Sequence, residues 1–183
     1  MEQLWARIER RLAELGCLDK MALRPGADPQ AIAQLERHLG VVLPDPVKRF
    51  LAIHDGQDGT GLVDGYTLLS IAGIQQQWDG WRELDEEAMN ADCADSMGSE
   101  PAGTIKPMYT NPAWIALTHD YGGNHVGLDL DPDLLGQPGQ VIAFGRDEDV
   151  KRLLANSFPE YMDIYVAWLE RARWNGQYLD VKE

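Results

Sequence analysis

Two histidines and a carboxylate, His119, Asp120 and His125, stand close together in the sequence. Imidazole and carboxylate groups are the ligands that zinc and iron use in proteins. A turn at 121–124 would bring the three side chains near one another if the flanking segments pair as a hairpin. With Asp129 added, the set suggests a metal-dependent enzyme. The four histidines are scattered and follow no zinc-binding motif, so we interpret these residues as polar turn residues and predict no metal and no cofactor.

A second group of carboxylates alternates along the segment 129–133, which reads Asp-Leu-Asp-Pro-Asp. A calcium loop begins in this way, but it needs glycine at its sixth position and glutamate at its twelfth. This chain has Leu134 and Gln140 at those positions. The segment is therefore interpreted as the end of a strand, in which an aspartate caps the following turn.

Nucleophile motifs are absent from the sequence, since neither G-x-S-x-G nor S-x-x-K occurs. Cys17 follows a glycine that should end a helix, and Cys93 lies among acids that disfavour a thiolate. The pair Gly122-Gly123 lacks the Lys-Ser/Thr of a phosphate-binding loop. We predict no catalytic residue and no enzyme activity.

The elements that would position these groups follow from apolar periodicity. Trp5, Ile8, Leu12 and Leu15 form one stripe of a helix that Gly16 ends. Further helices are predicted at 28–39, 43–53, 71–84 and from 150 to 169, and strands at 62–69, 113–117, 125–130 and 141–144. This order predicts an α+β fold in one domain, residues 1–183, whose mixed, largely antiparallel sheet is packed by N-terminal and C-terminal helices.

The charge of the chain is strongly uneven. The 183 residues carry a formal net charge of −14, and residues 51–150 alone carry −15 because Arg82, Lys106 and Arg146 are their only basic residues. This acidity argues against binding to nucleic acid or to an anionic membrane surface. It indicates either a solvated face that keeps the protein soluble or a surface that attracts a cationic partner.

The segment at about 85–104 is acidic and poor in apolar residues, so we expect an insertion or a loop there. Trp78 and Trp81 precede it and could serve as aromatic contacts of an interface, although burial in the core is the alternative. The predicted partner-binding residues are Asp55, Asp58, Asp64, Trp78, Asp79, Trp81, Glu83, Asp85, Glu86, Glu87 and Asp120.

The N-terminal residues interleave acids and arginines, unlike a secretory signal, and no stretch approaches the apolar length of a membrane span. We therefore expect a cytoplasmic protein with reduced thiols. Export by a route without a classical signal stays open.

Several short motifs occur in a fixed order. They are Pro25-Gly26-Ala27, Leu43-Pro44, His54-Asp55-Gly56-Gln57, Leu68-Leu69-Ser70, Trp114-Ile115, Asp120-Tyr121-Gly122-Gly123-Asn124, Leu128-Asp129-Leu130-Asp131-Pro132, Gly139-Gln140-Val141-Ile142 and Ala155-Asn156-Ser157-Phe158. This ordered set resembles the SUKH superfamily, also called the SMI/KNR cell-wall-assembly-regulator family, from about residue 4 to residue 170.

The resemblance implies an α+β fold without enzyme activity. Bacterial members are similar to immunity proteins that bind and neutralise toxins, and fungal members act as regulatory interaction proteins in cell-wall synthesis. The residues that the resemblance implies to be structural are Gly56, Trp114, Gly122, Gly123, Asp129, Asp131, Pro132 and Gly139.

Our main hypothesis from the sequence is a cytosolic bacterial immunity protein that binds a cognate toxin with a basic surface. The alternative is a regulatory or scaffold module of the same family that binds a housekeeping partner. A metal-dependent enzyme is the third hypothesis.

Overall fold

The computed structural model describes residues 1–63, 65–83 and 86–181, and for residues 86 and 87 the backbone alone. Within these residues the main sheet has five strands in the order β2-β7-β6-β5-β3. Their bounds are β2 Gly98–Glu100, β7 Val150–Ala155, β6 Gln140–Gly145, β5 Asn124–Asp129 and β3 Trp114–Ala116. Every neighbouring pair is antiparallel except β2 and β7. The predicted α+β class with a largely antiparallel sheet is confirmed.

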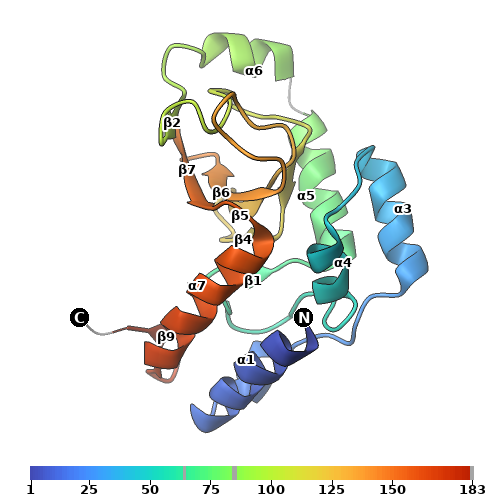
Figure 1. Cartoon of the computed structure of the whole chain (residues 1–183), viewed down its shortest axis with the longest axis vertical. Helices are drawn as coiled ribbons and strands as arrows, with labels where there is room; N and C mark the ends of the chain where they lie inside the picture. The colour runs from blue at the N-terminus through green and yellow to red at the C-terminus, as the bar shows by residue number, and fades with distance from the viewer. Residues whose placement is uncertain (64, 84–85, 182–183) are drawn as a thin grey trace.

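Helices and two small strand pairs complete the fold, and Figure 1 shows α5 beside the sheet, α3 farther out and β9 at the far end of α7. The helices are α1 Glu2–Glu14, α2 Leu18–Met21, α3 Pro29–Leu39, α4 Asp45–Leu51, α5 Ile71–Glu83, α6 Glu86–Asp92 and α7 Phe158–Arg171. The small pairs are β1 Thr67–Leu68 with β4 Thr118–His119, and β8 Arg173–Trp174 with β9 Leu179–Asp180. Figure 1 shows α6 and β2 at one end of the molecule and α1 at the other.

Local sequence explains where the long helices begin. Asp28 is the N-cap of α3, where its carboxylate accepts a hydrogen bond from Gln30 N at 2.6 Å and Pro29 occupies the first helical position. Ser157 caps α7 by accepting from Glu160 N. Both helices were expected to pack through apolar stripes, and their stripes are buried.

One hydrophobic core connects the helices to the sheet. Trp5 of α1 stacks on Phe50 of α4 with ring centroids 4.6 Å apart, and its indole N–H donates to Phe50 O. The hydroxyl of Tyr165 in α7 donates to Leu62 O, 103 residues earlier in the chain. These contacts hold the N-terminal helices, the centre of the chain and α7 together.

The structure corrects two predictions. The first concerns residues 150–154, which were predicted to be helical from the spacing of Val150, Leu153 and Leu154. They form β7, because the segment pairs with β6 on one side and with β2 on the other. Tertiary pairing overrides the local pattern here. The predicted helix is confirmed only from Phe158 onward.

The second correction concerns the acidic segment at about 85–104, for which a loop was one expectation; that the segment is an insertion stays a prediction. It contains α6 and β2. The Asn90 side chain fixes α6 by accepting from Tyr109 N and Thr110 N and by donating to Thr110 O. β2 lies parallel to β7, whose residues are about fifty positions away in the sequence. Both supports are nonlocal, so local composition gave no sign of them.

Candidate functional site

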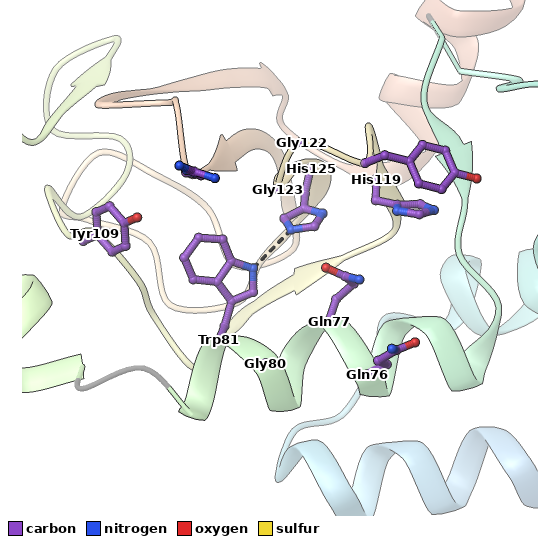
Figure 2. Close-up of a pocket in the computed structure, with 11 residues that line it drawn as sticks. Gln76, Gln77, Gly80, Trp81, Tyr109, His119, Gly122, Gly123 and His125 are labelled. Atoms are coloured by element: carbon purple, nitrogen blue, oxygen red, sulfur yellow. Dashed lines mark hydrogen bonds between the residues drawn. The ribbon is translucent and has the colours of Figure 1, made fainter.

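An open cleft of about 700 Å³ lies between α5 and the hairpin that joins β4 to β5 (Figure 2). Pockets for small ligands commonly have volumes of about 300–1,000 Å³. The lining residues are Gln76, Gln77, Gly80, Trp81, Tyr109, His119, Tyr121, Gly122, Gly123, His125 and Arg146. Figure 2 shows Gln77 and Trp81 extending from α5 toward His125, with Tyr109 and His119 on opposite sides.

Helix α5 presents Gln77 and Trp81 on one face because they are four residues apart. Asp55 fixes the start of this helix, since its carboxylate accepts from Ile71 N at 2.7 Å. Trp78 fixes the other side of the helix by donating from its indole N–H to Pro112 O at 2.9 Å. The cleft wall is therefore held at the start of α5 and near its middle.

His125 lies at the floor of the cleft and is 1% exposed. Its Nε2 accepts a hydrogen bond from the indole N–H of Trp81 at 3.1 Å. Its Nδ1 lies 2.8 Å from Thr118 O, so Nδ1 carries the proton and donates it to that carbonyl. Burial lowers the pKa of His125 below its usual value of 6.5, and the ring is a neutral structural link between α5 and β4.

The hairpin turn is organised by Asp120. Its carboxylate accepts from Gly122 N, Asn124 N and Asn124 Nδ2 at 2.7 to 2.9 Å. Burial alone would raise the pKa of Asp120, but the hydrogen bonds from Asn124 and Gly122 lower it overall. Tyr121 takes a left-handed conformation with φ of +65° and remains 79% exposed at the rim, where its ring lies 4.2 Å from that of His119.

Arg146 reaches the cleft from the turn after β6. Its backbone N–H donates to Gly123 O at 3.0 Å. The stem of its side chain passes over Gly123, where an added Cβ would lie 3.3 Å from Arg146 Cβ. No ion pair joins its exposed guanidinium to another residue in the described ranges.

The four residues of the metal hypothesis are not gathered into one site. His125 and Asp129 stand at opposite ends of β5, and His125 already uses both ring nitrogens. Nowhere in 1–63, 65–83 and 86–181 do three or more His, Cys, Asp or Glu side chains meet in a group that could hold a metal ion. The carboxylate of Asp120 accepts hydrogen bonds from residues of its own hairpin turn.

The carboxylates of the 129–133 segment are also used within the fold. Asp129 is fully buried, and it accepts from Gln140 Nε2 at 2.8 Å and from Asp131 N at 3.0 Å. Burial raises its pKa, although these two hydrogen bonds act in the opposite direction. Lys106 and Asn111 bind Asp131 and lower the pKa of that carboxyl.

The other residues of the family motif have structural surroundings as well. Gly56 has a φ of +74°, and a Cβ there would lie 2.4 Å from Ser70 N. Gly139, with a φ of +89°, donates to Asp129 O at 2.7 Å. Trp114 is buried, and Pro132 packs at the turn before Gly136. Gly122 and Gly123 differ, because they also line the cleft.

Some of the residues predicted to bind a partner lie at the cleft, and others lie elsewhere on the molecule. Trp81 enters the cleft and Asp120 shapes its rim, while Asp79 on α5 faces α3 and binds His38. Asp58 is exposed and pairs with Arg24, and Glu83 is exposed at the end of α5. Asp64 and Asp85 lie outside the described residues, as do the side chains of Glu86 and Glu87.

Sequence reasoning missed Gln76, Gln77, Tyr109, Tyr121 and Arg146 as cleft residues. One signal for Arg146 was available, since it is one of three basic residues between 51 and 150. No local sequence pattern indicated Tyr109, because its contact with Trp81 joins two segments that are distant in the sequence.

In the described part of the chain, no helix has the length and apolar character needed to cross a membrane. The cleft is lined by polar and aromatic side chains.

Comparison with known proteins places this architecture in a family. Residues 26–164 match the SMI1/KNR4 family (SUKH-1). The chain is 35% identical over 95% of its length to the cell wall biosynthesis/cell cycle regulator smi1 of Schizosaccharomyces pombe, and 30% identical over 78% to the cell wall assembly regulator SMI1 of Saccharomyces cerevisiae. It is 28% identical over 83% to a glucan synthesis regulatory protein of Neurospora crassa. The chain spans 35–37% of the length of these curated relatives. It belongs to the SMI1/KNR4 family.

Proposed function

We propose that this chain is a non-catalytic regulatory module that binds a protein partner through the cleft between α5 and the β4–β5 hairpin. The observation that carries the proposal is the open, aromatic-walled cleft, whose rim presents Tyr121 and Arg146 to solvent. Exposed aromatic and arginine side chains are enriched among the residues that contribute most to protein interfaces.

The chemistry of the lining supports binding rather than a reaction. His125 is neutral and engaged at both nitrogens, and the lining holds no Asp, Glu, Cys or Lys among the described residues. His119 is the other imidazole of the lining, where its ring lies against Tyr121, and the described lining gives it no carboxylate or nucleophile with which to act as a general acid–base pair. The relatives, moreover, are named as regulators.

The names of these relatives refer to cell wall assembly and to glucan synthesis. We extend that role to this chain as a proposal: a module of a cytoplasmic regulator whose partner belongs to the machinery that controls cell-wall synthesis. Cys17, which is buried, and Cys93 are both free thiols, as a reducing compartment would keep them.

Toxin neutralisation is a second candidate, and its support is the acidity. Exposed carboxylates occur where α6, β2 and the β6–β7 turn meet. They are Asp92, Asp95, Glu100, Asp147 and Asp149. Such a surface would speed encounter with a basic toxin. The relatives named above are fungal regulators and give this candidate no support, so regulation stands first.

A comparative capture experiment tests the proposal. The full chain, its Trp81→Ala variant and its Asp58→Ala variant are immobilised, and the bound proteins are quantified by mass spectrometry. Asp58 is an exposed control outside the cleft lining. We expect a set of proteins that the chain and Asp58→Ala retain and that Trp81→Ala loses. Equal capture by all three proteins contradicts the role of the cleft.

The two candidates separate in a second experiment. Co-expression with the product of the neighbouring gene should give neither binding nor protection from toxicity if the module is regulatory. Protection from a toxic neighbour would instead favour the immunity interpretation.

A further inference from the structure

The cleft lining has a charge opposite to that of the chain around it. Residues 51–150 carry a net charge of −15, yet the lining contains a cation, Arg146, and no carboxylate. Of the acids near Arg146 and the hairpin, Asp149 is exposed outside the lining, and three others have partners within the fold. Asp120 is held by its own turn, Asp147 accepts from Asn124 Nδ2 at 3.1 Å, and Glu148 pairs with Arg152 at 2.9 Å.

Arg146 is positioned to receive an external anion. Its stem lies over Gly123 and its backbone is tied to the hairpin, whereas its guanidinium is exposed and unpaired within the described residues. A guanidinium binds a carboxylate through two parallel hydrogen bonds, with more geometric specificity than a lysine would give. His119 and His125 add little charge, because burial lowers the pKa of both rings.

The remaining lining suits a peptide. Trp81 and Tyr109 meet edge to face with centroids 5.8 Å apart, and Tyr121 stands at the rim. These rings offer apolar surface to the side chains that flank an acidic residue. The amides of Gln76 and Gln77 provide both donors and acceptors for a peptide backbone.

We infer that the cleft receives an acidic segment of a partner protein, in which an aspartate or glutamate pairs with Arg146 and a neighbouring aromatic residue packs on Trp81, Tyr109 and Tyr121. This inference rests on the proposed function and specifies the partner's chemistry. The attracting surface is thus the cationic cleft, and the partner segment is acidic rather than basic.

Three capped peptides test the inference: acetyl-Tyr-Asp-Tyr-amide, the same peptide with Asn, and the same peptide with Lys. Binding to the ¹⁵N-labelled full chain is followed by NMR up to about 5 mM peptide, where short peptides with weak affinity are detectable. We expect the Asp peptide to shift the Trp81 indole signal and to bind about tenfold more tightly than the Asn peptide, the ratio typical of a charge-assisted pair.

Charge reversal at the contact is the decisive variant. Arg146→Glu should lose the preference for the Asp peptide and gain one for the Lys peptide. Arg10→Glu is the matched control, since Arg10 is also an exposed arginine but lies on α1 outside this lining, and it should behave like the unaltered chain.

Three results with the peptides overturn the inference: no binding of the Asp peptide, equal binding of the Lys peptide, or an unchanged preference in Arg146→Glu. Free aspartate is a further arm, and if it binds as tightly as the Asp peptide, the cleft is a small-anion site and the peptide inference is wrong. None of these results would affect the capture experiment with Trp81→Ala, so the proposed function can stand or fail separately.

Discussion

The two ends of β5 carry the same kinds of residues and use them in opposite ways. At its start, Asp120 and Asn124 build a hairpin whose remaining polar and aromatic groups face an open cleft. At its end, Asp129 is fully buried and its oxygens are bound by Gln140 and Asp131. Both ends appear in the sequence as acidic, glycine-containing turns.

The two ends differ in whether their polar groups are all hydrogen-bonded within the fold. A buried carboxylate must be paired within the fold, so the Asp129 end can stabilise the structure but has little left to offer a ligand. The Asp120 end satisfies its carboxylate within four residues and leaves Tyr121 and Arg146 available. Acidic turns therefore indicate a binding site only when their neighbours remain unpaired.

The largest expected effect is at the buried end. Asp129→Ala would leave one N–H of the Gln140 amide and the Asp131 N–H without their acceptor in a dry site, at about 1–3 kcal/mol for each N–H, while the other amide N–H keeps Thr104 O. We expect the free energy of unfolding to fall by about 4 kcal/mol, measured by urea denaturation. Asp133→Ala, in the same turn but partly exposed, is the control and should change it by less than about 1 kcal/mol. Similar losses in both variants would contradict the comparison.

The buried side chain of Lys151 lies between residues associated with the two ends of β5, and its titration provides the next prediction. Lys151 Nζ lies 5.9 Å from the ring centroids of Tyr109, which lines the cleft, and of Trp114, which pairs with Asp129 across the sheet. Nζ also donates to Glu148 O. Burial lowers the pKa of Lys151 from 10.5 to about 8, so between these values the unfolded chain binds more protons than the native protein.

Stability should therefore rise with pH across this window, by up to about 3 kcal/mol from Lys151. The measurement is the difference in unfolding free energy between the unaltered chain and Lys151→Met at pH 7.5, 8.5 and 9.5. Taking the difference removes the opposing titration of Cys17, whose pKa burial raises. A difference that stays constant with pH would show that the amine is not desolvated.

The exposed end should be less sensitive. Asp120→Ala removes the acceptor for Gly122 N and Asn124 N, but water can reach this turn and replace part of the loss. We expect a loss of about 1.5 kcal/mol in the free energy of unfolding. A loss equal to that of Asp129→Ala would remove the distinction between the two ends.

The two carboxyls should also respond to acid with opposite signs. The pKa of Asp120 is lowered, so its stabilising contribution is present above the unfolded value of 3.8 and is lost as the pH falls through the native value. The pKa of Asp129 is raised, so its contribution is present at low pH and is lost as the pH rises from 3.8 through the native value. Unfolding of Asp120→Asn and Asp129→Asn at pH 4 and pH 7, each compared with the unaltered chain, should show these opposite trends.

The sequence predicted the parts of this comparison that depend on local patterns. Apolar stripes located α1, α3 and α7, and alternation with turn glycines located β5 and β6. β7 was predicted as helix although it pairs with the preceding strand β6, and its other neighbour, β2, lies about fifty positions earlier. A loop was expected where α6 and β2 occur, because β2 pairs with that distant strand.

The candidate site was predictable in fragments only. Trp81 was selected as an interface residue and His125 as a turn residue, but nothing in the sequence indicated that the indole would donate to the imidazole. The acidity directed attention to carboxylates, whereas the structure places an arginine in the cleft wall. The cleft forms because residues of α5, β4 and the β6–β7 turn come together in the fold, and composition alone does not show which residues meet.

The smallest stability effect is expected at the junction of α5 and the hairpin. Trp81→Phe keeps an aromatic ring in the cleft and removes one donor to His125 Nε2, and since the cleft is open, water can replace that donor. We expect a loss of less than about 1 kcal/mol in the free energy of unfolding.

The more informative measurement at this junction is ¹⁵N NMR of the His125 imidazole. It should show the Nδ1–H form in the unaltered chain at neutral pH, with a pKa below 6.5 because the ring is buried. The Nδ1–H donor to Thr118 O is untouched by the substitution, so the variant should keep this tautomer. A protonated ring at pH 7, or the Nε2–H form, would contradict the hydrogen-bond arrangement that links α5 to β4 and gives the cleft its floor.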